Sequence, residues 1–342
     1  MKRARKASLK NLNSFSVEAI ADRLIELESV DDLQAFASVH RFDPASDLVL
    51  GGGSNVLFAG DLHGTVILNR ISGKKIVTDT NDEVLVEACA GENWHQLVMW
   101  SLEQGLSGLE NLSLIPGLAG AAPIQNIGAY GVELADVFDS LEAFDLDNGD
   151  LLEFGHGDCR FGYRDSRFKS LDAGRFLITR IRMRLQRRFV PKLAYSGIRE
   201  ELDAMGIESP NAGQVSDAII RIRRRKLPDP LLTGNAGSFF KNPVVNRSTA
   251  EQLQRDLAGL PVYPQENDLA KLSAAWLIEQ CGWKGRSMGR AAVSAQHALV
   301  LINKGNATGA EILALAQAVQ ASVKTQFGIE LEPEPLIINT VV

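Results

Sequence analysis

The segment at residues 105–131 constrains the fold more than any other part of the sequence. It is rich in Gly, Ala and Pro, and Glu110 is its one charged residue. Such a run cannot build a core from its own side chains, and long segments of this kind in compact domains usually serve a function. We therefore predict that its backbone lies directly against a large, flat ligand. A purely structural loop is the alternative.

A second glycine-rich turn occurs earlier, at residues 51–55. It reads Gly-Gly-Gly-Ser-Asn and follows a short apolar run at 47–50 that predicts a buried strand. Bare backbone N–H groups in such a turn can point at an anion. The turn is not a P-loop, because the Lys-Ser/Thr pair is missing, and Val56 stands where GxGxxG needs its third glycine. A phosphate cradle and a tight turn between two strands both stay open.

The stretch 234–243 places one serine among glycines and aromatics. Gly234 and Gly237 precede Ser238, and a Phe pair follows it. Glycines allow positive φ and a close approach to a ligand, while the aromatics indicate an anchor in a core. The pattern is typical of a loop that presents one hydroxyl at a fixed place. A packed turn around the Phe pair is the alternative.

Hydrophobic periodicity predicts a chain that mixes strands and helices. Residues 1–10 are expected to be a frayed tail, and a capping box at 29–32 starts a helix that ends near His40. The turn at 147–149 predicts a hairpin. Further strands are expected at 17–27, 65–69, 74–78, 83–90, 137–145, 151–153, 175–185 and 297–303, and helices at 92–104, 216–226, 249–257, 273–281 and 308–327.

Size and composition exclude several classes of protein. A chain of 342 residues can bury a large core in two or three domains. The net charge of −6 does not favour nucleic-acid binding, and no apolar run is long enough to span a membrane. The three scattered cysteines fit a reducing cytoplasm and argue against a disulfide framework or a zinc site. A Pro-rich link at 227–230 is the expected domain boundary.

Charged residues stand out at four places. Arg164 lies between a Tyr and an Asp in a loop, and Glu332 and Glu334 lie in the expected terminal strand at 329–338. A buried carboxylate is costly without a partner, so either glutamate is a candidate acid. The basic run 221–226 could bind an anion, although a solvated helix face is the default. The arginines within 175–185 indicate a solvated face rather than a nucleic-acid stripe.

Together these residues resemble the UDP-N-acetylenolpyruvoylglucosamine reductase family over nearly the whole chain, and most closely its branch with a substrate-side tyrosine loop. The order and spacing of the motifs carry the resemblance. They are GGGSN at 51–55, IPG and GAAPIQNIGAYG within 115–131, YRDS at 163–166, KLPDP at 226–230, GNAGSFFKNP at 234–243 and ALVLIN at 298–303.

The resemblance implies an α+β fold with a two-part FAD-binding domain of the vanillyl-alcohol-oxidase (PCMH) type and a C-terminal α+β substrate domain. The implied domains are 1–77 joined by the strand 328–342, then 78–227, and the substrate domain 228–327. It also implies a cytoplasmic monomer that acts in peptidoglycan precursor synthesis, and hence in cell-wall biogenesis, cell shape and cell division, without nucleic-acid or membrane partners.

The resemblance further implies non-covalent FAD, with NADPH as co-substrate. The flavin pyrophosphate is expected on the turn 51–55 and near 120–122, and the isoalloxazine ring against 124–130. The implied cofactor-binding residues are Gly51, Gly52, Gly53, Ser54, Asn55, Ile115, Pro116, Gly120, Ala121, Ala122, Ile124, Gln125, Asn126, Gly128 and Tyr130.

The family reduces the enolpyruvyl ether of UDP-GlcNAc to a D-lactyl ether, with hydride delivered from flavin N5 to the vinyl carbon. Negative charge then develops beside the carboxylate, so the site needs donors there and an acid. By resemblance, Arg164 grips the carboxylate and Glu334 donates to its other oxygen. Ser238 protonates the carbanion.

The residues expected to hold the UDP-sugar or the nicotinamide nucleotide are Tyr195, Lys226, Asn242, Tyr263, Lys284 and His297. Lys284 also fits a simple turn lysine, and His297 a satisfied strand-end histidine. Relatives of this branch can carry Gln at position 297 and a basic residue at position 336, where this chain has His297 and Leu336. Leu336 removes a possible partner for a phosphate or carboxylate.

Two other functions compete with this interpretation. An FAD-dependent sugar or alcohol oxidase of the same superfamily would share the flavin cradle, but it would commonly carry a covalent flavin link and reduce O₂. A non-catalytic nucleotide- or RNA-binding protein could use the run 221–226, in which case the protein would be colourless and its binding sensitive to salt.

Overall fold

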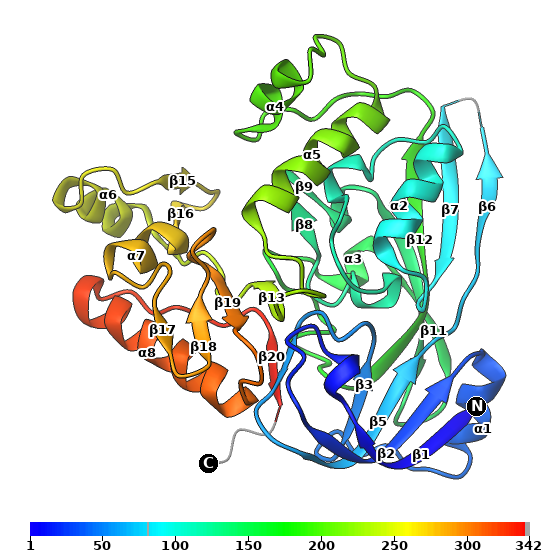
Figure 1. Cartoon of the computed structure of the whole chain (residues 1–342). Coiled ribbons are helices and arrows are strands. Elements are labelled where there is room, and N and C mark those ends of the chain that lie inside the picture. Colours follow the sequence, from blue (N-terminus) through cyan, green and yellow to red (C-terminus); the bar gives the residue numbers. More distant parts are fainter. Residues whose placement is uncertain (81, 339–342) are drawn as a thin grey trace. The chain divides into compact units, whose positions relative to one another are not determined.

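The structure is a computed structural model that describes residues 1–80 and 82–338. The chain forms two compact units, each built from several separate segments (Figure 1). The first unit comprises Met1–Ala7, Ala21–Gly53 and His63–Arg224, and the second comprises Ser8–Ile20, Ser54–Leu62 and the chain from Arg225 onward.

The first unit contains a four-stranded sheet in the order β1-β2-β5-β3. Its strands are β1 (Lys2–Ser8), β2 (Ile20–Leu27), β5 (Leu62–Asn69) and β3 (Asp47–Leu50), of which β3 runs parallel to β5. Helix α1 (Val30–Ala37) begins at the expected capping residue, since Ser29 Oγ accepts from the Asp32 N–H. Leu33 and Phe36 of α1 pack with Ile25 and Leu27 in a buried cluster.

Strand β1 shows that the expected frayed tail at 1–10 is wrong. Lysines along β1 pair with carboxylates of β2: Lys2 Nζ lies 3.4 Å from Glu26 Oε2, and Lys6 Nζ lies 2.5 Å from Asp22 Oδ1. Exposed ion pairs contribute little each, so the backbone pairing of an edge strand supplies the rest. This strand could not be recognised from the sequence, because its side chains are almost all polar.

A five-stranded antiparallel sheet forms the larger part of the first unit, in the order β11-β10-β12-β7-β6. Its strands are β6 (Lys74–Asp79), β7 (Glu83–Cys89), β10 (Phe138–Asp145), β11 (Leu151–Gly155) and β12 (Phe176–Gln186). β10 and β11 form the hairpin predicted at 147–149. The face of the sheet that carries Val86 and Ile181 packs in one buried core with Trp94 and Leu97 of α2 (Trp94–Glu103).

The arginines of β12 are paired with carboxylates of the neighbouring strands. Arg180 Nε lies 3.1 Å from Glu142 Oε1, and Arg182 Nε lies 2.9 Å from Glu87 Oε2. Arg184 contacts both Glu83 and Asp139. The alternating arginines therefore form cross-strand ion pairs.

Short elements complete the first unit. They are α3 (His156–Cys159), α4 (Ile198–Ala204), most of α5 (Ala212–Lys226), the strands β8 (Gly128–Ala129) and β9 (Val132–Glu133), and the 3₁₀ turns Glu110–Leu112, Ala119–Ala121 and Leu134–Asp136. α4 and α5 share a small apolar cluster that includes Ile198, Leu202, Ile219 and Ile222.

The second unit is built around a four-stranded sheet in the order β13-β19-β18-β17. These strands are β13 (Asn235–Ser238), β17 (Ser287–Met288), β18 (Ala291–Val293) and β19 (Val300–Asn303). A three-stranded sheet contains β14 (Val244–Asn246), β15 (Val262–Pro264) and β16 (Leu269–Leu272), and the helices are α6 (Arg247–Asp256), α7 (Ala274–Gln280) and α8 (Gly309–Phe327).

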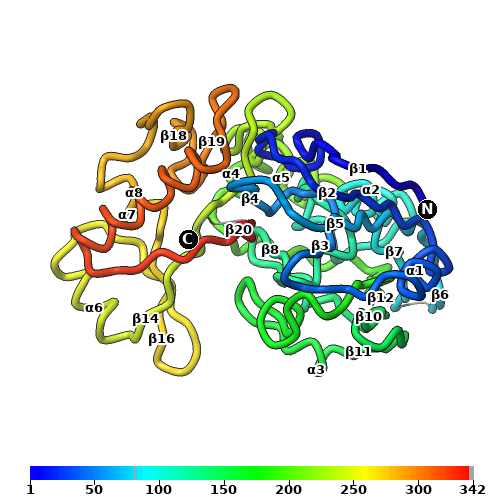
Figure 2. The backbone as a smooth tube through the Cα atoms, turned by 90° about the horizontal axis from the view of Figure 1, so that it is seen from below, coloured from blue at the N-terminus to red at the C-terminus, as the bar shows by residue number. Residues whose placement is uncertain are grey.

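Two segments from far apart in the sequence join in the second unit. β20 (Leu336–Ile338), red in Figure 2, runs parallel to β4 (Val56–Phe58). The segment Ser8–Ile20, which includes a 3₁₀ turn at Lys10–Leu12, brings Phe15 against Phe239 with ring centroids 6.2 Å apart. The second unit therefore depends on residues near the N-terminus.

The elements confirm the expected α+β class. The separation of two FAD-binding subdomains near residue 77 and the boundaries at 227 and 327 stay predictions. The part of the expected terminal strand beyond residue 338 lies outside the described residues. No helix within the described ranges is long and apolar enough to cross a membrane.

Gly309 gives a test of packing in the second unit. A Cβ at this position would lie 1.7 Å from the Phe58 carbonyl oxygen. Gly309→Ala should lower the free energy of unfolding by about 2 kcal/mol, because backbone must move to admit the methyl group.

Gly157 is the matched control, because a Cβ there meets no atom within 4 Å. Gly157→Ala in α3 should be neutral or raise stability by about 0.5 kcal/mol. Thermal and urea unfolding followed by circular dichroism measures both changes. Equal effects of the two substitutions would contradict the packing argument.

Candidate active site

The glycine turn after β3 leaves backbone donors free. Gly53 has a φ of +62°, and the N–H groups of Gly52 and Gly53 have no acceptor in the described part of the chain. A Cβ on Gly52 would lie 3.0 Å from the Cα of Gly117. The turn is therefore in close backbone contact with the Gly/Ala/Pro-rich segment, and it offers N–H groups to an anion.

The Gly/Ala/Pro-rich segment is itself held by backbone contacts. The Ala119 N–H donates to Glu92 O at 2.8 Å, and the Gly120 N–H donates to Ala90 O at 2.9 Å. A Cβ on Gly120 would lie 2.4 Å from Ala90 Cβ, so only glycine fits there. Ala121 in turn lies 3.6 Å from the place of a Cβ on Gly51. Two of the segments expected to bind FAD are thus neighbours.

Asn126 fixes the next part of this segment from inside. Its amide donates to Glu133 Oε2 at 2.7 Å and to Gly162 O at 3.1 Å, and its Oδ1 accepts from the Ala135 N–H at 3.0 Å. The side chain is buried. Because these bonds occupy the amide, the expected contact of Asn126 with a cofactor would come from its backbone.

Arg164 lies in the first unit beside Gly128. Its Nη2 donates to the Gly128 carbonyl at 2.5 Å, and its Nη1 lies 3.7 Å from Glu133 Oε1. Arg164 also has a φ of +54°, a conformation that is unfavourable for a residue with a side chain and that is enriched at functional sites. The structure therefore places this predicted catalytic arginine against the segment predicted to hold the flavin ring.

Tyr130 and Tyr195 meet edge to face, with ring centroids 5.3 Å apart. Asn111 donates to both the Tyr130 and Lys192 carbonyls at 2.9 Å, which ties the segment to the chain before Tyr195. Tyr195 is half exposed. A predicted cofactor residue and a predicted substrate residue are thereby brought together within the first unit.

Arg223 belongs to the basic run 221–226 that the sequence marked as a possible anion site, but the sequence did not distinguish it from the rest of the run. Its Nε is buried with no hydrogen-bond partner in the described chain. Burial is the largest cause that lowers the pKa of Arg223, and the positive charge of Arg164 lowers this pKa further. The interaction with Tyr130 acts in the opposite direction and raises the pKa. One signal was available: Arg223 lies four residues after Ile219, on the buried face of α5.

The second unit places Ser238 and Glu334 on adjacent backbone. Ser238 pairs with Val300 in the sheet, and the Glu334 N–H donates to the carbonyl of Phe239 at 2.8 Å. Phe239 is fully buried, so it anchors this end of β13. Gly237 has a φ of +70°, which explains a glycine directly before the serine.

Two neighbouring residues also support this part of the site. Asn55 Nδ2 donates to the Glu334 carbonyl at 3.3 Å, and Asn242 Oδ1 accepts from the Ala274 N–H at the start of α7 at 3.0 Å. The other candidate acid, Glu332, is exposed and lies 2.5 Å from Lys241 Nζ. Glu334 is less exposed than Glu332, and its backbone bonds directly to Phe239 beside Ser238, so its position favours it as the candidate acid.

The remaining predicted substrate residues also lie in the second unit. Lys284 Nζ lies 3.1 Å from Glu279 Oε1, and Tyr263 is half exposed on β15. His297 Nδ1 accepts from the Leu299 N–H at 3.2 Å. Burial, followed by the charges of Lys226 and Lys284, lowers the pKa of His297, so the ring is neutral at pH 7.

The predicted site therefore divides between the units. Arg164, the glycines 51–53 and the segment 115–130 belong to the first unit, whereas Ser54, Asn55, Ser238 and Glu334 belong to the second. The meeting of these two groups around one ligand stays a prediction. No group of His, Cys, Asp and Glu suited to a metal ion occurs among the described residues.

Comparisons with known proteins match two separate parts of the chain. A model of the FAD-binding domain matches residues 21–155, and a model of the C-terminal domain of UDP-N-acetylenolpyruvoylglucosamine reductase matches residues 229–338. A reductase of that name from Burkholderia multivorans is 50% identical over 329 residues, covering 95% of this chain and 94% of the relative. This chain belongs to the UDP-N-acetylenolpyruvoylglucosamine reductase family.

Further relatives extend the match. The reductase from Azoarcus sp. (strain BH72) is 50% identical over 336 residues, covering 97% of this chain and 96% of the relative. The crystal structure of the reductase from Thermus caldophilus superposes with a TM-score of 0.66 at 25% identity, over 99% of this chain and 98% of that one. The reductase family therefore accounts for both units.

Glu110, at the start of the predicted flavin-binding segment, gives a test by pH. Burial raises the pKa of Glu110, although its carboxylate accepts from the Gly108 N–H at 2.6 Å. A carboxyl with a raised folded pKa favours folding below its unfolded pKa of about 4.3, and this contribution is lost as pH rises through the folded pKa. Glu110→Gln should therefore raise the melting temperature at pH 7 to 8, with a smaller gain near pH 4.

Glu103→Gln is the control, since Glu103 is exposed at the end of α2. Its melting temperature should follow the wild type at every pH. Scanning fluorimetry from pH 4 to 8 measures both variants, and a gain for Glu110→Gln that is independent of pH would contradict the buried-carboxyl explanation.

Proposed function

We propose that this protein uses NADPH and FAD to reduce UDP-N-acetylglucosamine enolpyruvate to UDP-N-acetylmuramate, a step in peptidoglycan precursor synthesis. The observation that carries the proposal is the pairing of Glu334 with the backbone beside Ser238, inside the region that matches the reductase C-terminal domain. We further propose that the enzyme is a cytoplasmic monomer.

The residues of the first unit fit FAD. The free N–H groups of Gly52 and Gly53 suit a pyrophosphate, and the glycines here and at position 120 let backbone approach closely. The orphaned Nε of Arg223, near Tyr130 and Arg164, offers a donor to an electron-rich ring atom or to a carboxylate. Bound FAD would supply hydride chemistry, as acceptor from NADPH and donor to the vinyl carbon.

Arg164 is proposed to bind the substrate carboxylate. Its guanidinium is already oriented by the Gly128 carbonyl and by Glu133, so less rotamer freedom is lost when it binds. An arginine can grip both carboxylate oxygens. As negative charge spreads into the carboxylate, this contact strengthens, and it therefore favours the transition state over the ground state.

Ser238 is proposed to deliver the proton that completes the reduction. Gly237 lets the chain turn directly before it, and the buried Phe239 fixes the strand directly after it. A serine hydroxyl is a weak acid in water, so it needs such a fixed position and a relay that restores its proton. Glu334, in its protonated form, would hydrogen-bond the substrate carboxylate and leave Ser238 free to act on carbon.

The UDP-sugar and the nucleotide are proposed to bind through Tyr195, Lys226, Asn242, Tyr263, Lys284 and His297. Tyr195 and Tyr263 are half exposed, so a ligand could reach part of each ring from solvent. Because the pKa of His297 is lowered, its neutral ring would serve as a hydrogen-bond donor or acceptor rather than as a cation.

The activity has a direct test. Purified protein with FAD should oxidise NADPH only after UDP-N-acetylglucosamine enolpyruvate is added, one NADPH being consumed for each UDP-N-acetylmuramate formed. The loss of absorbance at 340 nm, with product detection by mass spectrometry, measures this ratio. Equally fast oxidation of NADPH by O₂ without substrate would instead favour an oxidase.

Ser238→Ala should separate the two half-reactions. Loss of the proton donor should slow reoxidation of the reduced flavin by substrate about 10²- to 10⁴-fold, whereas flavin reduction by NADPH should stay within about two-fold. Stopped-flow absorbance of the flavin measures both rates.

Ser287→Ala is the matched control for this experiment. Ser287 lies on β17, at the opposite edge of the same sheet. It should leave both rates unchanged. If reoxidation in Ser238→Ala is as fast as in wild type, Ser238 does not supply the proton.

A further inference from the structure

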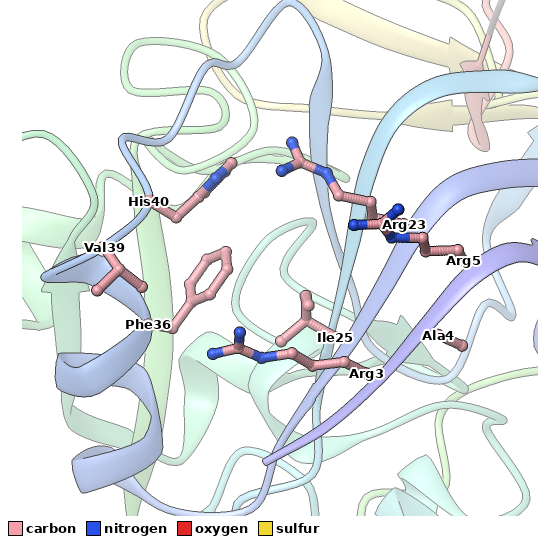
Figure 3. Close-up of a pocket in the computed structure, with 8 residues that line it drawn as sticks. All are labelled: Arg3, Ala4, Arg5, Arg23, Ile25, Phe36, Val39 and His40. Atoms are coloured by element: carbon pink, nitrogen blue, oxygen red, sulfur yellow. The ribbon is translucent and has the colours of Figure 1, made fainter.

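The first unit has a cavity of about 400 Å³ that the reductase chemistry does not use. Figure 3 shows Arg3 and Arg5 from β1, Arg23 and Ile25 from β2, and Phe36, Val39 and His40 from α1 and the chain after it around this space. Sites for small molecules measure about 300–1,000 Å³. The cavity can therefore hold a small ligand.

The charges around the cavity differ from those on the rest of the same two strands. Lys2 and Lys6 of β1 are each paired with carboxylates of β2. Arg5 and Arg23 have no ion pair or side-chain hydrogen bond in the described chain, and the Nε of Arg3 donates only to the Met1 sulfur at 3.3 Å. Asp22, beside Arg23, is bonded to Lys6.

Strand geometry accounts for this concentration of arginines. Arg3 and Arg5 lie two residues apart in β1, and Arg23 and Ile25 lie two residues apart in β2, so each pair shares one face. Ile25 is buried in the cluster that includes α1. Arg3, Arg5 and Arg23 thus line the cavity around an apolar floor, with no carboxylate among the lining residues. All three arginines are exposed to solvent.

His40 forms the opposite wall with Phe36. The two rings stack with centroids 4.6 Å apart, and His40 Nε2 is 2.7 Å from Asp47 Oδ2. Burial acts to raise the pKa of Asp47, but hydrogen bonds from the Asp43 N–H, from His40 and from Thr65 outweigh it and leave the pKa lowered. Asp47 therefore stays ionised and fixes the imidazole in the wall.

The cavity is separate from the predicted flavin cradle within the same unit. The glycines 51–53 follow β3, which is one edge of the four-stranded sheet, whereas Arg3 and Arg5 belong to β1 at the other edge. An anion bound here would contact none of the residues assigned to FAD or to the substrate.

From this cluster we infer a second anion site in the protein, which binds a small phosphate monoester through Arg3, Arg5 and Arg23. Guanidinium groups bind phosphate oxygens in pairs, and a dianion offsets the repulsion among the cations that line the cavity. The apolar floor of Ile25 and Phe36 accepts the organic part of the ester, so the ester binds more tightly than inorganic phosphate.

Calorimetric titration of the FAD-loaded protein with phenyl phosphate tests this inference, in low salt and in a buffer free of phosphate. Wild type should bind phenyl phosphate more tightly than inorganic phosphate. Arg5→Gln/Arg23→Gln should raise the dissociation constant at least about ten-fold, which corresponds to the loss of about 1.4 kcal/mol.

The control Arg188→Gln/Arg255→Gln removes the same charge from exposed positions outside the cavity, and it should change the dissociation constant less than about two-fold. Equal binding by wild type and Arg5→Gln/Arg23→Gln, equal weakening in the control, or no binding by wild type would each overturn the inference. Binding of phosphate and phenyl phosphate with the same affinity would overturn the role of the apolar floor.

A second measurement uses only the wild-type protein, so its result does not depend on whether a variant folds. In ¹⁵N-labelled wild type, phenyl phosphate should shift the Nε–H signals of Arg5 and Arg23 at the same concentrations that saturate the heat signal. Unchanged arginine signals at saturation would place the ligand elsewhere and contradict the site.

Discussion

Close approach of backbone to backbone is the constraint on which this structure depends. Gly52 meets Gly117, Gly120 meets Ala90, and Gly234 meets Phe15, each at a distance that a Cβ could not accept without movement. These contacts bring segments together without intervening side chains. They leave N–H groups and small residues at the surface of the predicted FAD cradle, where side chains would otherwise exclude a flat ligand.

Polar side chains near this cradle divide into those used to build it and those left for a ligand. Asn126 and Asn111 donate their amide N–H groups to backbone carbonyls and to a carboxylate. Arg223 keeps a buried donor without a partner, a costly state in a finished core. Asn126, whose amide and carbonyl are both bonded within the described chain, therefore belongs to the scaffold, whereas Arg223 keeps a donor that a ligand could use.

Motifs with local physical causes could be predicted from the sequence. The Ser29 cap, the hairpin at 147–149 and the long helix that begins after Thr308 all depend on near neighbours in the chain, and they formed as expected. Strand β1 could not be predicted, because the carboxylates that pair with it come from β2. The buried position of Arg223 Nε could not be predicted, because the other basic residues of the run 221–226 face solvent. The hydrogen bonds of the Asn126 side chain could not be predicted either, because its partners lie at 133–135 and 162.

The interleaving of the two units bears on how the chain matures during synthesis. The second unit uses Phe15, β4 and β20, which span the chain from its first residues to its last described ones. A nascent chain on the ribosome can complete most of the first unit early, but β4 must wait, unpaired, for β20 to emerge. The segment Val56–Phe58 is fully apolar, so until β20 has been made this strand lacks its parallel partner and could be bound by a chaperone.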